Sequence, residues 1–331
     1  MVYTLSMLEI NQKPLQDYTF IDLFAGIGGF HLALSSFGAK CVFSSEWDIN
    51  AQKVYKNNFG IEPNGDITKI NEKNIPEHDI LCAGFPCQAF SISGKQLGFN
   101  DTRRTLFFDI ARILKEKRPK IVLMENVKNF ERHDNGKTLK VILNTLDSLN
   151  YNVFYKVLNS ADYNIPQKRE RIYFVCFRKD LNISDFKFPE PVILQKHLVD
   201  ILETGSETEK LFINRNDIVI NKTDDKFDNK PIRLGQIALG RQGERIYSTK
   251  GTAITLSAFG GGIFARTGGY LIDGKVRRLT PRECARVMGF PDSFQIADVN
   301  NIAYQQFGNS VVVDVLQNIL SEVAKKLETK K

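Results

Sequence analysis

The sequence of 331 residues lacks a disulfide pattern, a membrane-length apolar run and a secretory leader. Its five cysteines are odd in number and scattered without a CxxC pair, which argues against a disulfide framework or a zinc site and for a reducing compartment. No apolar run approaches the length of a bilayer span, and residues 1–10 have no basic start followed by an apolar core. These absences predict a soluble, cytoplasmic protein that binds no metal and no membrane.

The charge balance is basic, with 45 Lys and Arg against 38 Asp and Glu and a net charge of +7. A solvated basic surface and a polyanionic partner such as nucleic acid both explain that charge, and charge alone does not separate them. The length suffices for one large domain and a smaller one.

Strand-like and helix-like segments alternate through the first half of the chain. Residues 18–24 are rich in β-branched and aromatic side chains, a glycine turn follows at 25–29, and an apolar helical face ends at Gly38. The same alternation continues with strands at 40–46, 79–83 and 120–124 and helices at 48–59, 105–117 and 137–149. This order predicts a doubly wound, mostly parallel α/β sheet of the Rossmann-like type.

The second half changes in character near residue 200. Ten of the 23 glycines fall between Gly235 and Gly274, among several Arg and Lys residues, and short β segments at 253–256 and 270–272 alternate with glycine turns. This composition predicts a smaller β-rich domain whose loops allow close approach, although an irregular insertion of no specific role is the alternative.

Two helices are expected near the end of the chain. Thr280-Pro-Arg-Glu283 is a capping box with proline at the first helical position, and Gly289 and Pro291 end that helix. A last helix near 310–327 places apolar residues on one face, which we expect to pack on the large domain.

The first glycine turn, Phe24-Ala-Gly26-Ile-Gly28-Gly29, indicates a nucleotide-like ligand. NAD, FAD and S-adenosylmethionine (AdoMet) all suit such a turn, but the third glycine of GxGxxG is missing, which disfavours NAD. Glu46 would bond ribose hydroxyls and Trp47, the only tryptophan, would stack on adenine. The structural alternatives are that Glu46 is a solvated strand end and that Trp47 is a packing aromatic.

A thiol, a carboxyl and two guanidinium groups are expected at one edge of the sheet. Cys87 follows the strand at 79–83, Glu125 follows the strand at 120–124, and Arg169 and Arg171 precede an apolar strand at 172–176. Residues 88–104 have the composition of a mobile lid. Alone, these residues would be an inert thiol, a solvated strand end and a charged turn; their coincidence indicates a catalytic site.

The sequence resembles the DNA (cytosine-5) methyltransferases over nearly its whole length. The motifs that carry the resemblance occur in the family's order: Phe24-Ala-Gly-Ile-Gly-Gly, Gly84-Phe-Pro-Cys87-Gln, Glu125-Asn-Val, Gln167-Lys-Arg169-Glu-Arg171 and Phe307-Gly-Asn309-Ser. The resemblance implies an AdoMet-binding catalytic domain at 1–199 and a target-recognition domain at 200–280. It also implies a hinge at 281–308 and a C-terminal helix at 309–331 that returns to the catalytic domain.

The resemblance assigns the chemistry. Cys87 would add to C6 of a flipped-out cytosine, Glu125 would hold or protonate N3, and Arg171, with Arg169 less firmly assigned, would hold O2 and a neighbouring phosphate. The AdoMet site would comprise Phe24, Gly26, Gly28, Glu46, Trp47, Asp66, Ile67, Pro86 and Asn309. DNA would meet Ser91, Ser93, Lys95, Gln242, Arg245, Ser257 and Gly262.

We therefore expect a bacterial, site-specific DNA cytosine-5 methyltransferase of a type II restriction–modification system. Arg245 can bond guanine bidentately, Gln242 could fill the gap left by the flipped base, and the target implied by the resemblance is GCGC-like with the inner cytosine methylated. The resemblance implies a monomer that acts alongside a partner endonuclease without a stable complex. The alternatives are an RNA cytosine-5 methyltransferase, a catalytically silent DNA-binding relative and, less favoured, a NAD-dependent oxidoreductase.

Overall fold

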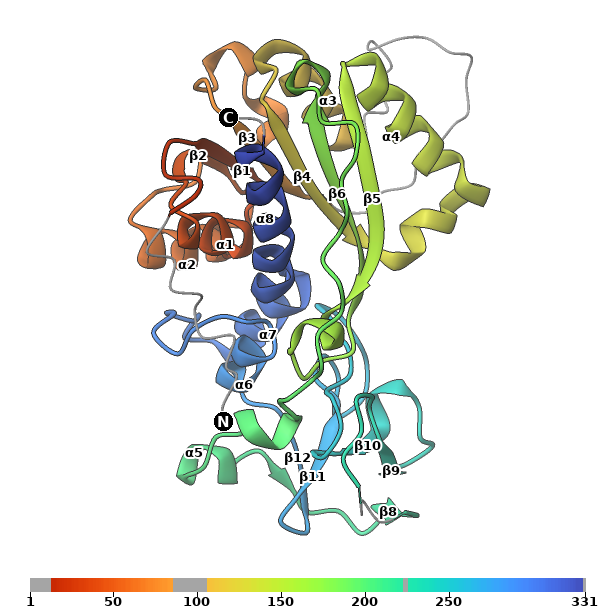
Figure 1. Ribbon diagram of the computed structural model, residues 1–331. Helices are drawn as coiled ribbons and strands as arrows, with labels where there is room; N and C mark the ends of the chain where they lie inside the picture. The colour runs from red at the N-terminus through yellow and green to blue at the C-terminus, as the bar shows by residue number, and fades with distance from the viewer. Residues whose placement is uncertain (1–12, 86–105, 223–225, 330–331) are drawn as a thin grey trace.

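The computed structural model describes residues 13–85, 106–222 and 226–329. Two six-stranded sheets organise these residues, one above the other in Figure 1. The strand order is β2-β1-β3-β4-β6-β5 in the first sheet and β7-β12-β11-β10-β9-β8 in the second. Helices α6 and α7 lie between the two sheets (Figure 1).

The first sheet is mostly parallel, as predicted. Its strands are β1 (Thr19–Leu23), β2 (Lys40–Ser45), β3 (Ile80–Gly84), β4 (Ile121–Val127), β5 (Tyr151–Asn159) and β6 (Glu170–Arg178). Strands β1 to β4 pair in parallel, whereas β6 runs antiparallel to both β4 and β5. A short connection through η4 (Ser160–Tyr163) joins β5 to β6 without a crossover helix, which permits the antiparallel pairing.

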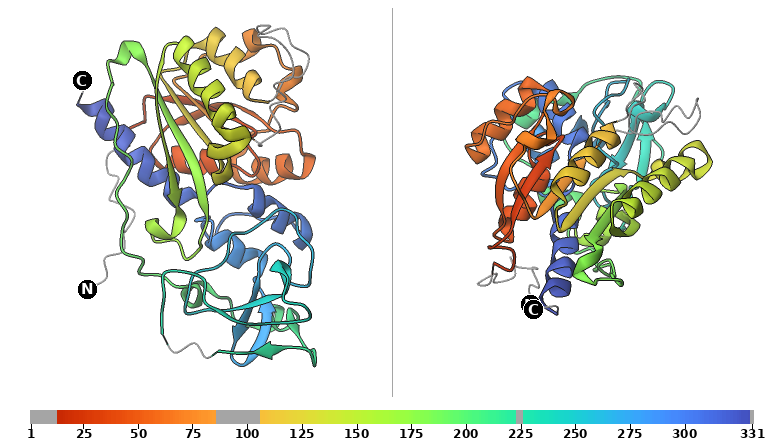
Figure 2. Two further views of the ribbon diagram at one scale, coloured as in Figure 1. Left: turned by 90° about the vertical axis from the view of Figure 1, so that its right-hand side faces the viewer. Right: turned by 90° about the horizontal axis from the view of Figure 1, so that it is seen from above.

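Helices cover both faces of this sheet (Figure 2), because successive strand residues are buried on opposite sides. One apolar cluster joins alternate strand residues to α1 (Gly29–Ser36), α2 (Ile49–Phe59) and α8 (Val313–Glu328). The other cluster joins the intervening residues to α3 (Leu106–Lys117) and α4 (Lys137–Ser148). Each large side chain buried in these clusters contributes roughly 1.5–3 kcal/mol. The sheet is therefore doubly wound, and its parallel strands end at one common edge.

Local signals end the helices where the sequence predicts. The Asp48 carboxylate accepts hydrogen bonds from the N–H groups of Asn50 and Ala51 and so caps α2, which ends at Gly60 in a left-handed conformation. Thr280 and Glu283 form the expected capping box of α6 (Pro281–Arg286), and Gly289 follows with a positive φ of 78°. Helix α7 (Asn300–Asn309) then leads into α8.

The second sheet is small and largely antiparallel, with β10 and β11 as its parallel pair. Its strands are β7 (Phe212–Ile213), β8 (Val219–Ile220), β9 (Arg233–Gln236), β10 (Arg245–Ser248), β11 (Gly269–Ile272) and β12 (Lys275–Arg278), preceded by α5 (Ser206–Glu209). The remaining short 3-10 turns are η1 (Ile67–Lys69), η2 (Glu72–Asn74), η3 (Lys128–Gly136), η5 (Lys179–Leu181), η6 (Leu198–Ile201) and η7 (Gln242–Glu244).

The predicted β segment at 253–256 is wrong. Ala253 makes a single isolated bridge to Gln167, and the rest of the segment belongs to no strand. Its main-chain groups bond instead to the turn before β6, since the Ala253 N–H donates to Pro166 O at 2.7 Å and the Lys168 N–H donates to Ala253 O at 2.8 Å. The segment therefore forms no ladder with the second sheet, although the Ile254 N–H donates to the Tyr270 hydroxyl of β11 at 3.1 Å.

In the part of the chain that the structure describes, no helix is both long and apolar enough to cross a bilayer.

Candidate active site

The carboxyl ends of the parallel strands bring most of the predicted site residues to one edge of the first sheet. Phe24 follows β1, Glu46 follows β2, Phe85 follows β3 and Glu125 lies near the end of β4. Cys87 and Pro86, the predicted nucleophile and its neighbour, lie outside the described residues, directly after Phe85. This edge is where open α/β sheets bind ligands.

The glycine turn after β1 is held against Glu46. The Gly26 N–H donates to Glu46 Oε2 at 2.8 Å, and the Asp48 N–H donates to Oε1 at 2.8 Å. Burial raises the pKa of this carboxyl, and hydrogen bonds from Asp48 and Gly26 oppose the rise. Gly28 has a φ of 88°, and a Cβ there would lie 2.2 Å from the Phe59 ring. Only glycine fits at that position.

The ends of β2 and η1 form the rest of the predicted cofactor wall. Trp47 is 80% exposed, although it follows a buried strand. The Glu46 N–H donates to Asn64 O at 2.9 Å, which ties the end of β2 to the turn that carries Asp66. The Asp66 carboxylate accepts the Thr68 N–H at 3.0 Å, and Ile67 is buried beneath it.

These residues suit an adenosyl ligand. The Trp47 indole is free to stack on a planar base, and the open space above Gly26 lets a ligand approach the backbone. The Glu46 carboxylate, at the fixed end of β2, can accept hydrogen bonds from the hydroxyl groups of a ligand. Asn309, the last residue of α7, is exposed.

Glu125 and Arg171 form a buried charged pair on neighbouring strands. Glu125 Oε1 lies 3.2 Å from Arg171 Nε, and the two side chains are 9% and 13% exposed. Among the described residues, Oε1 has no aligned hydrogen-bond donor. Burial raises the pKa of Glu125, while the charges of Arg171 and Arg169 oppose the rise. The raised pKa favours the protonated carboxyl, and a protonated carboxyl can donate a hydrogen bond to a ligand.

Asn126, to which the sequence interpretation gave no role, bonds to Phe85, the last described residue after β3. Its side-chain Nδ2 donates to Phe85 O at 2.9 Å, and its Oδ1 accepts the Val127 N–H at 2.8 Å. The signal that could have revealed it is its place directly after Glu125 in a strand that ends at the site.

Arg169 is placed differently from Arg171. It is 2% exposed, and its guanidinium donates to the main-chain carbonyls of Leu256, Gly308 and Ser310. Gln167, also buried, makes similar contacts. These donors are used within the protein, so the expected contact of Arg169 with cytosine or phosphate receives no support from its geometry.

Two predicted DNA-reading loops meet in the small domain. Gln242 lies in η7, directly before β10, which begins at Arg245. Gly243 packs so closely on Gly261 that a Cβ at Gly243 would lie 2.0 Å from Gly261 O, and Gly262 has a φ of 96°. The structure therefore brings the 242–245 and 257–262 segments together. The predicted contacts Ser91, Ser93 and Lys95 lie outside the described residues.

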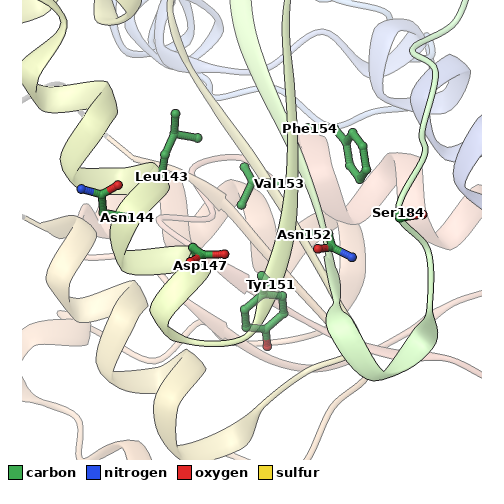
Figure 3. Close-up of a pocket in the computed structure, with 8 residues that line it drawn as sticks. All are labelled: Leu143, Asn144, Asp147, Tyr151, Asn152, Val153, Phe154 and Ser184. Carbon is green, nitrogen blue, oxygen red and sulfur yellow. The ribbon is translucent and has the colours of Figure 1, made fainter.

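A hollow in the described residues lies away from this edge (Figure 3). It has a volume of about 390 Å³ between α4 and β5, and none of its lining residues belongs to a predicted site set. Within the described ranges, no group of three or more His, Cys, Asp or Glu side chains is placed to hold a metal ion.

Comparison with known proteins identifies the family. A family model described as C-5 cytosine-specific DNA methylase matches residues 18–325. The chain belongs to this family. It is 61% identical over 325 residues to the type II methyltransferase M.HhaI of Haemophilus parahaemolyticus, covering 98% of this chain and 99% of that protein. It is 42% identical over 344 residues to the type II methyltransferase M.HpaII of Haemophilus parainfluenzae, covering 98% and 94%.

Solved structures show the same fold. The crystal structure of the S. pombe Dnmt2 methyltransferase superimposes with a TM-score of 0.69 at 22% identity, covering 94% of this chain and 99% of that one. The predicted family, fold class and enzyme class, a DNA (cytosine-5) methyltransferase of the type II restriction–modification kind, are thus confirmed. Membership of a methyltransferase family implies AdoMet as the methyl donor.

Proposed function

We propose that this enzyme methylates the inner cytosine of a GCGC-like site in double-stranded DNA through a covalent bond between Cys87 Sγ and cytosine C6. The observation that carries the proposal is the Glu125 carboxyl, which is buried and lies at the sheet edge with Oε1 3.2 Å from Arg171 Nε and no aligned hydrogen-bond donor among the described residues. Asn126 connects this strand to Phe85, two residues before Cys87.

The chemistry requires this combination of groups. Cytosine C5 is a poor nucleophile, and addition of a thiolate to C6 moves electrons toward N3 and makes C5 reactive. A protonated Glu125 can donate to N3 as that charge develops, and Arg171 can hold O2. C5 would then take the methyl group from the AdoMet sulfonium, whose S–CH3 bond breaks. Transfer of the C5 proton to a base restores the C5–C6 double bond, the thiolate leaves C6, and N3 returns its proton to Glu125. Because the ring atoms are inaccessible in a duplex, the cytosine must be flipped out.

The methyl group would come from AdoMet, whose sulfonium supplies an electrophilic carbon. Trp47, Glu46 and the turn at Gly26 would hold its adenosine, with Asp66 and Ile67 on the adenine side. Phe24 and Asn309 would line the same site. Gly28 permits the close packing of the turn on Phe59.

Recognition of the DNA would fall to the two loops that meet in the small domain. Arg245 would bond guanine in the major groove and Gln242 would occupy the space left by the flipped cytosine. The enzyme would act as a monomer and would protect DNA from a partner endonuclease without forming a stable complex with it.

A trapping experiment tests the proposal. The purified protein is incubated with tritiated AdoMet and a duplex that carries 5-fluorocytosine at the inner cytosine of GCGC. Because fluorine at C5 cannot leave as a proton, the enzyme should remain covalently bound in denaturant, with label in the complex. Cys87→Ala should abolish the complex, whereas Cys176→Ala, at a buried cysteine outside the site, should retain it.

Each other outcome has a defined meaning. A complex on another sequence but not on GCGC would contradict the target. A complex on the matching RNA alone would favour an RNA cytosine-5 methyltransferase. A complex that persists in Cys87→Ala would overturn the role of Cys87.

A further inference from the structure

The Arg169 guanidinium joins two segments of main chain through three carbonyl groups. Nη1 donates to Leu256 O at 2.9 Å, and Nη2 donates to Gly308 O at 3.0 Å and Ser310 O at 2.6 Å. Leu256 directly precedes the predicted DNA-reading segment, whereas Gly308 and Ser310 are the free carbonyls at the end of α7. A cation at that helix terminus is favourable, and few residue types could serve all three acceptors at once.

Gln167, two residues earlier, makes a second set of contacts to the same region. Its Nε2 donates to Val287 O at 2.6 Å, and its Oε1 accepts the Leu256 N–H at 3.1 Å. Both Gln167 and Arg169 are buried, and the intervening Lys168 is exposed. The alternation directs two of the polar side chains of the Gln-Lys-Arg-Glu-Arg motif into the junction between the domains.

Gly308 completes the junction from the other side. A Cβ at Gly308 would lie 2.3 Å from Ala258 N and 2.3 Å from the Ser257 carbonyl carbon. The backbone there is not in the left-handed region, so glycine is required by close packing and not by its conformation. The segment at 253–258, which we call the recognition segment, is thus seated directly on α7.

We propose that Arg169, together with Gln167, is a positioning residue that couples the seating of the recognition segment to the catalytic pair of Glu125 and Arg171. This inference rests on the proposed function of the site. In it, Arg169 contacts neither cytosine nor phosphate and acts through the residues that it holds.

The physical basis is the cost of a buried, partly unpaired guanidinium. When the recognition segment leaves its seat, Arg169 loses the Leu256 carbonyl, and its charge must find another partner. Arg171 of β6 lies two residues after Arg169, its Nε is 3.2 Å from Glu125 Oε1, and the charge of Arg169 acts on both groups. A displaced Arg169 would therefore compete with Arg171 for Glu125, and the carboxyl would be poorly placed for cytosine N3. Methyl transfer would proceed only with the segment seated.

The decisive variant is Arg169→Lys, which keeps the positive charge but loses the planar fork that reaches three carbonyls. We expect the single-turnover methylation rate on GCGC to fall at least about tenfold while the dissociation constants for DNA and AdoMet change less than about threefold. We also expect the preference for GCGC over duplexes with one altered base pair to shrink, because the methylation rate then depends less on whether the recognition segment is seated on α7. Arg178→Lys, on the same strand but paired with Asp180, is the matched control and should leave all of these unchanged.

Gly308→Ala tests the same coupling without replacing Arg169. The added methyl should displace the recognition segment and reproduce the loss of rate and of discrimination. The double variant should be little slower than either single variant, because both remove one interaction. If Arg169→Lys does not fold, the Gly308→Ala result alone decides.

Two results would overturn the inference. Wild-type rate and discrimination in both variants would show that the junction is only structural. A raised dissociation constant for DNA with an unchanged single-turnover rate would show that Arg169 contacts DNA directly. Failure of the proposed function is separate, because in that case the wild-type enzyme would not methylate GCGC at all.

Discussion

The side-chain amide of Asn126 donates a 2.9 Å hydrogen bond to the main-chain carbonyl of Phe85. Both residues are buried, and the Phe85 ring packs on Phe107 and Phe130 with centroids 6.0 and 5.7 Å away. Strand β4, which carries Glu125, thereby fixes the last described residue before Cys87. This amide therefore ties the strand that carries Glu125 to the residue two positions before Cys87.

Replacing this amide should slow catalysis more than it weakens binding. We expect Asn126→Ala to lower kcat by about 10- to 100-fold, because a small displacement of a catalytic group costs that much, while KM for DNA changes little. Steady-state methylation with tritiated AdoMet measures both. Asn152→Ala is the matched control, since Asn152 also donates its amide to a carbonyl, that of Ile183, but far from the site. An unchanged kcat in Asn126→Ala would contradict the role.

The raised pKa of Glu125 gives a stability prediction with a defined sign. Between the ordinary carboxyl value of 4.5 and the higher pKa in the fold, the folded state binds more protons than the unfolded state. The free energy of unfolding therefore falls as pH rises through that window, and the loss remains at higher pH. Glu125→Gln removes this titration, so the variant should gain stability relative to wild type as pH rises, although methylation is lost.

Urea denaturation at several pH values between 4.5 and 9 measures this difference. Glu131→Gln, at an exposed carboxyl of η3, provides the control and should show a constant difference from wild type. A stability difference for Glu125→Gln that does not grow with pH would argue that burial does not govern the Glu125 titration.

Arg112 of α3 supports the adenine side of the proposed cofactor site. Its guanidinium donates to Ile67 O at 2.6 Å, to Ile70 O at 2.9 Å and to the Glu72 carboxylate at 2.7 Å. Lysine cannot reach these acceptors together, so Arg112→Lys should loosen η1 and weaken AdoMet binding by about 3- to 30-fold.

The fluorescence of Trp47 reports this binding directly, because it is the only tryptophan and is 80% exposed. Titration of the emission with AdoMet gives the dissociation constant for wild type, Arg112→Lys and the control Arg178→Lys. Equal dissociation constants for all three proteins would refute the supporting role of Arg112. A Trp47 emission that does not change when AdoMet is added would refute the placement of Trp47 at the cofactor.

A buried ion pair fixes the second sheet to α6. Arg277 of β12 donates to Glu283 through Nη1 at 2.8 Å and Nη2 at 2.7 Å, and the side chains are 1% and 0% exposed. Arg277→Met should lower the free energy of unfolding by about 3–5 kcal/mol, because it leaves a buried carboxylate without its cation. Replacing both residues by Met should restore part of that loss.

The matched control is the exposed pair of Arg286 and Asp292, which has the same two-point geometry. Asp292→Asn should cost less than about 1 kcal/mol, because solvent screens that pair. Denaturation curves that show equal losses for the buried and exposed pairs would contradict the argument from burial.

The sequence predicted what local patterns determine. The alternation of apolar strands and amphipathic helices gave the doubly wound sheet, and the polar residues at strand ends gave the edge at which Glu46 and Glu125 lie. Caps such as Asp48 and Thr280 were predictable because their partners lie within three residues.

Contacts between residues far apart in the chain produced no local pattern in the sequence from which they could be predicted. The segment at 253–256 has the composition of a strand, but the main-chain groups of Ala253 bond to Pro166 and Lys168 and not to a neighbouring strand, so local propensity gave the wrong structure. Arg169 and Arg171 belong to one short motif, and the structure distinguishes them by their partners: Arg169 donates to the carbonyls of Leu256 and Gly308, whereas Arg171 pairs with Glu125. The antiparallel direction of β6 likewise depends on the short connection that precedes it.

The packing of α8 on α1 has a consequence for synthesis of the chain. Gln317 Nε2 donates to Ser36 Oγ at 3.0 Å across 281 residues, and both helices share one apolar cluster. Such non-local contacts form slowly, and here they cannot form until the ribosome has made nearly the whole chain. We expect nascent chains that stop before α8 to expose the apolar face of α1. Truncated products should therefore aggregate or be degraded, and should not accumulate as partly active methyltransferases.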